Sequence, residues 1–205
     1  MSYKTILKPV SAEFTEQRSR FIAALYPVSS EQEAVELINA RKQEFWDAKH
    51  NVYAYRLAEG NIARFSDDGE PHSTAGKPTL DVLVGAELTN CLLITTRYFG
   101  GILLGTGGLV RAYSTAARLA IEQAKIVEIR DCVKYALKLD YSQYDKLNAF
   151  LKSKNTVVLS TDFSEQINIE IILPVKSSEA FCLELTDTFF GEISPQFIEN
   201  CTFAL

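Results

Sequence analysis

The sequence has little of what metal centres, disulfide frameworks and membrane spans require. Its four cysteines, Cys91, Cys132, Cys182 and Cys201, lie far apart, no C-x-x-C pair occurs, and the chain has two histidines. A zinc site is therefore hard to assemble, and we expect reduced core thiols in a cytoplasmic protein. No run approaches ~18 apolar residues, so no membrane-spanning helix is expected. The N-terminus also shows no signal-peptide pattern.

An excess of positive charge is also missing. The formal net charge is −5: residues 1–130 hold 15 Lys and Arg against 15 Asp and Glu, and residues 131–205 hold 6 against 11. A general DNA-binding protein would be basic overall, so DNA is not an expected partner. The first part can offer a local basic patch. The acidic second part could attract a protein partner or simply favour solubility.

The second part of the chain has the periodicity of a ferredoxin-like domain. Three segments alternate between apolar and polar residues, as strands with one solvent-exposed face do, and two stretches carry apolar stripes at helical spacing. A further segment, residues 193–203, is interpreted as a last strand. The predicted order is strand 133–140, helix 142–151, strand 157–163, strand 167–173, a helix after Pro174 and strand 193–203. This β-α-β-β-α-β order predicts a ferredoxin-like arrangement for residues 131–205.

The first part, residues 1–130, is less regular but mixes both element types. Buried strands are expected at 21–25, 51–56 and 91–96, and helices after the capping box of Ser30 and Glu33, from Pro78, and from about Leu109 to Ala124. The whole chain is therefore predicted to be an α+β protein of two domains, with a boundary near residue 130.

A first loop concentrates acidic residues. Asp67, Asp68 and Glu70 place three carboxylates within four residues. Asp67 and Asp68 could hold Mg²⁺, or a carboxylate could act as a general base. Alternatively, Asp-Gly forms a turn between strands in which Asp67 accepts backbone N–H bonds and Glu70 is solvated. The candidate ligand-binding residues of this loop are Ser66, Asp67, Asp68, Gly69, Glu70, Thr74, Gly76 and Lys77.

A second loop concentrates glycine. Five of the ten glycines lie between positions 100 and 108, directly before the helix expected from Leu109. Free N–H groups at a helix N-terminus favour an anion, here a phosphate of RNA or of a nucleotide. Alternatively, the glycines allow a tight connection to pack beneath another element. The candidate residues are Arg97, Tyr98, Gly100, Gly101, Gly105, Gly107, Gly108 and Arg111.

Three motifs taken together resemble the IMPACT family, most closely its bacterial YigZ-like members. The motifs are F-S-D-D-G-E-P at 65–71, T-A-G-K-P at 74–78, and R-Y-F-G-G-I at 97–102 followed by L-G, then G-G-L-V-R-A-Y at 107–113. The resemblance covers roughly residues 1–130, and the remainder is similar to the small C-terminal domain of bacterial members. One departure is the pair His72 and Ser73, where small residues with a glycine are expected.

The resemblance implies a first domain like the second domain of a small-subunit ribosomal protein, and a second domain like the last domain of elongation factor G. It also implies a link to translation. The leading hypothesis is therefore a non-enzymatic regulator that binds RNA or the ribosome through both loops and the helix face of Arg111 and Arg118. The alternative is a metal-assisted enzyme acting on a small phosphorylated or nucleotide ligand.

Overall fold

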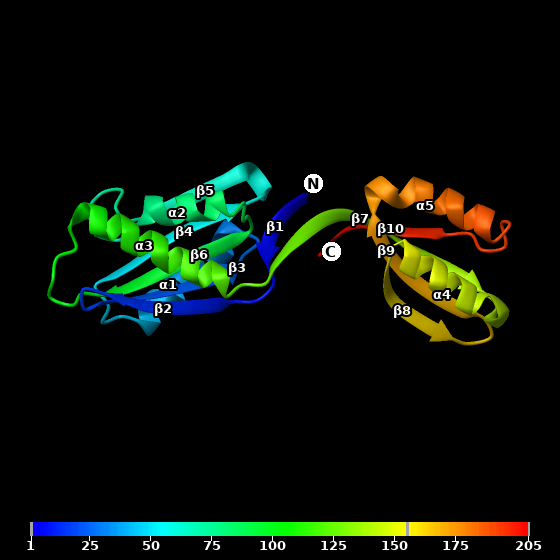
Figure 1. The fold of residues 1–205 in the computed structure, drawn as a ribbon, viewed down its shortest axis with the longest axis horizontal. Coiled ribbons are helices and arrows are strands. Elements are labelled where there is room, and N and C mark those ends of the chain that lie inside the picture. Colours follow the sequence, from blue (N-terminus) through cyan, green and yellow to red (C-terminus); the bar gives the residue numbers. More distant parts are fainter. Residues whose placement is uncertain (1, 155, 205) are drawn as a thin grey trace. The chain divides into compact units, whose positions relative to one another are not determined.

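The computed structural model describes residues 2–154 and 156–204, which form an α+β protein with two sheets and five α-helices (Figure 1). The chain divides into two compact units: one runs from Tyr3 to Glu128, and the other continues from Ile129 and includes Ser2. Within the described part of the chain, no helix combines the length and the apolar character that crossing a membrane requires.

The first unit begins with three strands and then combines strands with helices. They are β1 (Ser2–Ile6), β2 (Val10–Glu16), β3 (Ser19–Pro27), α1 (Glu31–Glu44), β4 (His50–Leu57), η1 (Glu59–Asn61), β5 (Ile62–Ser66), α2 (Gly76–Gly85), β6 (Cys91–Tyr98) and α3 (Gly105–Glu122). Strands β2 to β6 form an antiparallel sheet in the order β2-β3-β6-β4-β5. The predicted strands at 21–25, 51–56 and 91–96 lie within β3, β4 and β6.

Helices cover both faces of this sheet. The α2 and α3 helices pack on one face through Leu83 and Tyr113, and α1 packs on the other face through Ile38 (Figure 1). Along β6, Leu93 belongs to the first core and Leu92 to the second. A central strand that is buried on both faces needs apolar residues on both, which explains the continuous apolar run at residues 91–94 of β6.

The second unit has the ferredoxin-like order that the sequence predicts. Its elements are β7 (Ile126–Leu139), η2 (Tyr141–Gln143), α4 (Tyr144–Ser153), β8 (Val157–Phe163), β9 (Ile167–Pro174), α5 (Val175–Thr188) and β10 (Gln196–Ala204). Strand β7 pairs with both β10 and β9, and β9 pairs with β8, all antiparallel. Leu147 and Leu151 of α4 share one core with Phe181 and Leu185 of α5.

The helix expected from Leu109 begins four residues earlier, at Gly105. Glycine is a poor helix former, so its cluster indicated a loop. In the structure Gly105, Gly107 and Gly108 lie in the first turn of α3, where backbone N–H groups need no partner within the helix. The glycine cluster is therefore divided between a connection and the start of a helix.

Candidate functional site

Four connections of the first unit meet at one end of its sheet, and we call this region the loop end. It consists of residues 17–18, 45–49, 67–75 and 99–104. The antiparallel register brings the ends of their strands together, since Arg97 of β6 lies opposite Phe21 of β3 and His50 of β4. Both candidate loops belong to this end.

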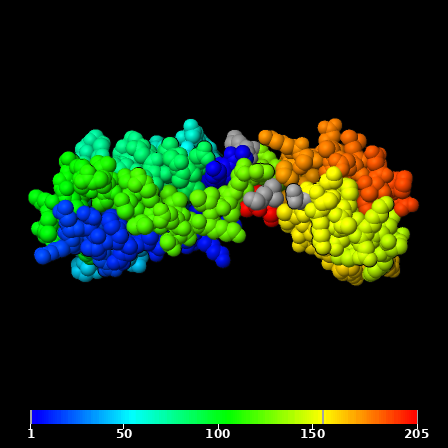
Figure 2. Space-filling view, viewed as in Figure 1, coloured from blue at the N-terminus to red at the C-terminus, as the bar shows by residue number. Residues whose placement is uncertain are grey.

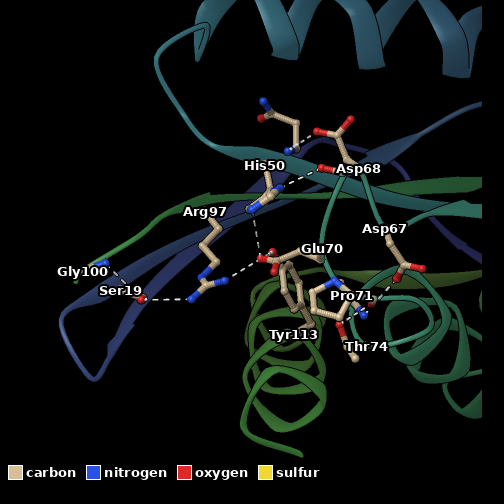
Figure 3. A network of polar contacts seen from close by, with 12 residues as sticks. Ser19, His50, Asp67, Asp68, Glu70, Pro71, Thr74, Arg97, Gly100 and Tyr113 are labelled. Atoms are coloured by element: carbon tan, nitrogen blue, oxygen red, sulfur yellow. Dashed lines mark hydrogen bonds and ion pairs between the residues drawn. The ribbon is translucent and has the colours of Figure 1, made fainter. Parts of the chain in front are cut away.

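A buried carboxylate, that of Glu70, joins the two candidate loops (Figure 3). Its Oε1 accepts a hydrogen bond from Nη1 of Arg97 at 2.6 Å and another from the hydroxyl of Tyr113 at 2.8 Å. The acidic loop is thereby attached to β6 and α3. The turn interpretation expected Glu70 in solvent, and the structure corrects it, because these two donors compensate for the burial.

The hydroxyl of Tyr113 is held in its protonated, donating form. Burial raises its pKa strongly, and the neighbouring negative charge of Glu70 acts in the same direction. The Tyr113 ring also meets Phe21 edge to face, with centroids 5.3 Å apart. The polar network thus rests directly on the apolar core of the unit.

His50 faces the same carboxylate from β4. Its Nδ1 lies 2.8 Å from the carbonyl oxygen of Asp68, and its Nε2 lies 3.8 Å from Oε1 of Glu70. A carbonyl oxygen only accepts hydrogen bonds, so Nδ1 must donate and the ring carries a proton there. His50 therefore orients the acidic loop through the loop's backbone.

Arg97 has a positioning role and does not offer its charge to the surface. It is buried, and besides Glu70 its guanidinium donates to the hydroxyl of Ser19 at 3.3 Å. The same hydroxyl accepts the backbone N–H of Gly100 at 3.2 Å, which fixes the start of the second loop (Figure 3). The expectation that Arg97 flanks an anion at the helix N-terminus does not agree with this placement.

Asp67 organises the start of α2. Its Oδ1 accepts backbone N–H bonds from Ala75 and Gly76 at 3.1 and 2.8 Å, and its Oδ2 accepts one from Ser73 at 2.8 Å. Acceptance of backbone N–H bonds is what the turn interpretation expects of Asp67. The turn, however, connects a strand to a helix and not two strands. Ser73 has a φ of 58°, in the region that favours the glycine expected there.

Asp68 points away from Asp67 and is also engaged. Its Oδ2 accepts the backbone N–H of Asn51 at 2.6 Å, and its Oδ1 lies 2.6 Å from Nζ of Lys42. Asp67 thus accepts three hydrogen bonds and Asp68 two, which leaves few of their lone pairs for a Mg²⁺ ion. No group of three metal-ligating side chains occurs among the described residues. The arrangement does not fit the magnesium site hypothesised for Asp67 and Asp68.

The remaining candidates of the acidic loop mostly stabilise its backbone. Ser66 accepts the N–H of Asp68, and Thr74 is buried and donates to the carbonyl of Pro71. Gly76 packs so closely that an added Cβ would lie 2.6 Å from the Ser66 carbonyl oxygen. Gly69 has a φ of 86°. Lys77 is exposed and pairs with Asp81 on the next turn of α2.

The glycines of the second loop serve different purposes. At Gly100 an added Cβ would lie 2.0 Å from the backbone of Arg18, so the β2–β3 turn packs directly on it. Gly101 and Gly105 have φ angles of 84° and 67° and open space around them. Gly107 meets nothing closer than Arg111 at 3.6 Å. The packing interpretation therefore holds for Gly100, and the others lie toward solvent or at the helix start.

The N-terminus of α3 is exposed and has no side-chain cap. Gly105, Thr106 and Gly107 are exposed, and Leu104 at the N-cap cannot accept a hydrogen bond through its side chain. Arg111 is exposed one turn further along the helix. Farther along, Arg118 lines a groove of about 520 Å³ between α2 and α3. These two helices lie on the face of the first unit that Figure 2 shows.

The loop end carries exposed apolar side chains, of which sequence reasoning missed Trp46, Ile102 and Leu103 and favoured a core position for Phe99. Trp46 is 82% exposed, Leu103 is 85% exposed, and Phe99 and Ile102 are about 40% exposed. The ammonium group of Lys49 lies 5.5 Å from the centre of the Phe99 ring. The signal available in the sequence was Trp46 itself, the one tryptophan of the chain, in a connection where no core position is expected.

Tyr98 connects this apolar group to the sheet. Its hydroxyl donates to Asp47 at 2.8 Å, and that hydrogen bond, together with burial, raises its pKa. The guanidinium of Arg20 lies 5.9 Å from the centre of the Tyr98 ring. Tyr98 thus fixes the 45–49 connection against β6.

Comparison with known proteins identifies the family. The family model described as the Impact N-terminal domain matches residues 17–121, which include the whole loop end. The chain belongs to the IMPACT family. A second model, described as a domain of unknown function (DUF1949), matches residues 137–192 of the ferredoxin-like unit. The resemblance found in the sequence motifs is therefore confirmed.

Bacterial members of the IMPACT family are similar over nearly the whole chain. IMPACT family member YvyE of Bacillus subtilis is 35% identical over 192 residues, which cover 93% of this chain and 88% of that protein. IMPACT family member YigZ of Escherichia coli is 31% identical over 195 residues, covering 94% and 96%. A solved structure titled "Crystal structure of an hypothetical protein" is similar with a TM-score of 0.62 and 31% identity, covering 97% of this chain and 98% of that one.

Proposed function

We propose that the protein is a translation-associated regulator that binds RNA, free or on the ribosome, through the loop end of its first unit. The observation that carries the proposal is the group of exposed aromatic and basic side chains at this end. Trp46 and Phe99 offer ring faces, and Lys49 lies 5.5 Å from the Phe99 ring centre. Unpaired bases stack on such rings, while neighbouring cations contact the phosphates.

The N-terminus of α3 supports the same function. Its exposed first turn presents backbone N–H groups at Gly105, Thr106 and Gly107, and Arg111 adds a positive charge nearby. Helix N-termini bind phosphate groups because their N–H groups are unpaired and the helix dipole favours an anion. The backbone groups and the rings occupy the same end of the sheet, so one strand of RNA can engage both.

The overall charge of the chain limits the interaction to this local patch. At a net charge of −5 the protein has no general attraction for nucleic acid, so binding must depend on a few cations. Arg97 is not one of them, because it is buried against Glu70. We assign the phosphate contacts to Lys49 and Arg111, and the stacking contacts to Trp46 and Phe99.

Binding to ribosomes and to a structured RNA with an unpaired loop, measured at several salt concentrations, tests the proposal. Changing Lys49→Ala together with Arg111→Ala should reduce the slope of log affinity against log salt by about 2. The matched control is Lys138→Ala with Lys152→Ala, which removes the same charge from exposed positions of the second unit. No binding by the wild-type protein at low salt, or equal effects of the two double variants, would contradict the proposal.

A further inference from the structure

Two cysteines of the second unit lie directly opposite each other on neighbouring strands. Cys132 of β7 is paired with Cys201 of β10 in the antiparallel register, and this register is regular from Glu199 to Ala204. Both cysteines are free thiols in the structure. Directly opposed residues of an antiparallel pair project to the same face of the sheet, with Cα atoms about 4.5–5.5 Å apart. Disulfides span Cα distances of about 4.4–6.8 Å, so the Cα separation typical of a directly opposed pair lies within the range that a disulfide can bridge.

We propose that Cys132 and Cys201 form a reversible, redox-sensitive disulfide that joins β10 to β7. The two thiols differ in their exposure to solvent, which determines which of them reacts first. Cys132 is fully buried and Cys201 is partly exposed. Burial raises the pKa of the Cys132 thiol, and Cys201 acts in the same direction, so Cys132 is slow to react with a reagent in solution. Cys201 is therefore the thiol that meets the oxidant first.

The oxidant is a low-molecular-weight disulfide, and the exchange is balanced. The Cys201 thiolate attacks one sulfur of the disulfide, breaks its S–S bond and releases one small thiol, which leaves a mixed disulfide on Cys201. The Cys132 thiolate then attacks the Cys201 sulfur and releases the second small thiol. Two protein thiols are oxidised and one small disulfide is reduced to two thiols, which take up the two protons lost by the cysteines.

The bond would close a loop that contains the rest of the second unit. Residues 133–200, which include α4, β8, β9 and α5, would lie between the two linked positions. A cross-link that closes a long loop restricts the unfolded chain and stabilises the folded one. In a reducing compartment such a bond is transient, as regulatory disulfides are. The oxidation state of this pair would thus set the stability of the second unit.

The test uses the full chain in buffers of reduced and oxidised glutathione at increasing oxidised fraction. We expect the number of free thiols to fall from four to two, a cross-linked peptide containing Cys132 and Cys201, and an increase in the Tm of the second unit of roughly 10 °C that dithiothreitol reverses. Cys201→Ser should abolish the change, and Cys182→Ser, which removes another partly exposed thiol, should preserve it.

Three results would overturn the inference. They are four free thiols at every oxidised fraction, a stable glutathione adduct on Cys201 without the cross-link, or a cross-link that involves Cys91 or Cys182. Should Cys201→Ser fail to fold, as judged by circular dichroism, peptide mapping of the wild-type protein still decides between these results. The RNA-binding surface lies in the other unit, so this test is independent of the proposed function.

Discussion

Glu70 and Arg97 form a buried ion pair, with Nη1 and Oε1 2.6 Å apart and side chains that are 3% and 6% exposed. The pair joins the acidic loop to the strand from which the glycine loop departs. Removing one partner of such a pair leaves a buried charge without compensation, which costs about 3–5 kcal/mol. The geometry of the loop end therefore depends on two residues that do not themselves lie at its surface.

The first prediction concerns this pair. Glu70→Ala should lower the free energy of unfolding by about 3–5 kcal/mol, because Arg97 and Tyr113 lose their shared acceptor. Chemical denaturation monitored by far-UV circular dichroism measures it. Glu87→Ala is the matched control, since Glu87 forms an exposed pair with Lys4, and its denaturation midpoint should not move. A similar effect of the two variants would show that the buried pair does not hold the loops.

The second prediction distinguishes the glycines of the second loop. Gly100→Ala should destabilise the protein by about 2 kcal/mol or more, because its Cβ would overlap the backbone of Arg18. Gly101→Ala should cost about 1 kcal/mol through its positive φ alone. Gly107→Ala should stabilise α3 by about 0.5 kcal/mol. Thermal unfolding of the three variants gives the ranking, and equal effects would contradict the assigned roles.

A third prediction concerns Asp67, which accepts three backbone N–H bonds. Asp67→Ala should destabilise the protein by about 2 kcal/mol or more, since it removes the acceptor at the start of α2 and leaves three partly buried N–H groups unpaired. Amide hydrogen exchange should show lost protection at Ser73, Ala75 and Gly76. Added Mg²⁺ should change neither the wild type nor the variant. Stabilisation of the wild type by Mg²⁺ that is lost in the variant would instead support metal binding at Asp67.

The fourth prediction is a dependence on pH in the alkaline range. Burial and the hydrogen bond to Glu31 raise the pKa of Tyr55 from 10.0 to about 12. Between these values the unfolded state has released a proton that the folded state keeps. This contribution to stability is therefore complete below pH 10 and is lost as the pH rises toward 12. Tyr55→Phe should cost about 1 kcal/mol at neutral pH and make the alkaline decline shallower. An unchanged slope would contradict the assignment.

The sequence predicted those elements whose pattern is local and regular. The alternation in residues 133–140 and 167–173 identified β7 and β9. These two strands are paired antiparallel in the structure, as the ferredoxin-like order requires. Strands β1, β2 and β5 were missed. Strand β2 alternates regularly between apolar and polar residues, so its signal was present in the sequence and was overlooked. Strand β5 alternates only weakly and lies at an edge of the sheet, where burial is low.

The candidate site was only partly predictable for a related reason. Glycine and acidic clusters identified two loops that lie at the same end of the sheet, but the role of each residue depends on contacts between distant segments. The sequence suggested that Arg97 is a surface cation. In the structure its guanidinium is buried and donates a hydrogen bond to Glu70, 27 residues away. The apolar exposure of Trp46 and Leu103 depends on which side of a connection faces solvent, and no periodicity encodes that.

We expect RNA to contact the loop end of the first unit. Amide hydrogen exchange of the full chain, with and without a saturating structured RNA at low salt, measures this contact. New protection should appear in residues 45–49 and 99–111, and exchange in residues 157–204 should be unchanged. Protection confined to the second unit, or saturating RNA that alters exchange at neither loop, would contradict it.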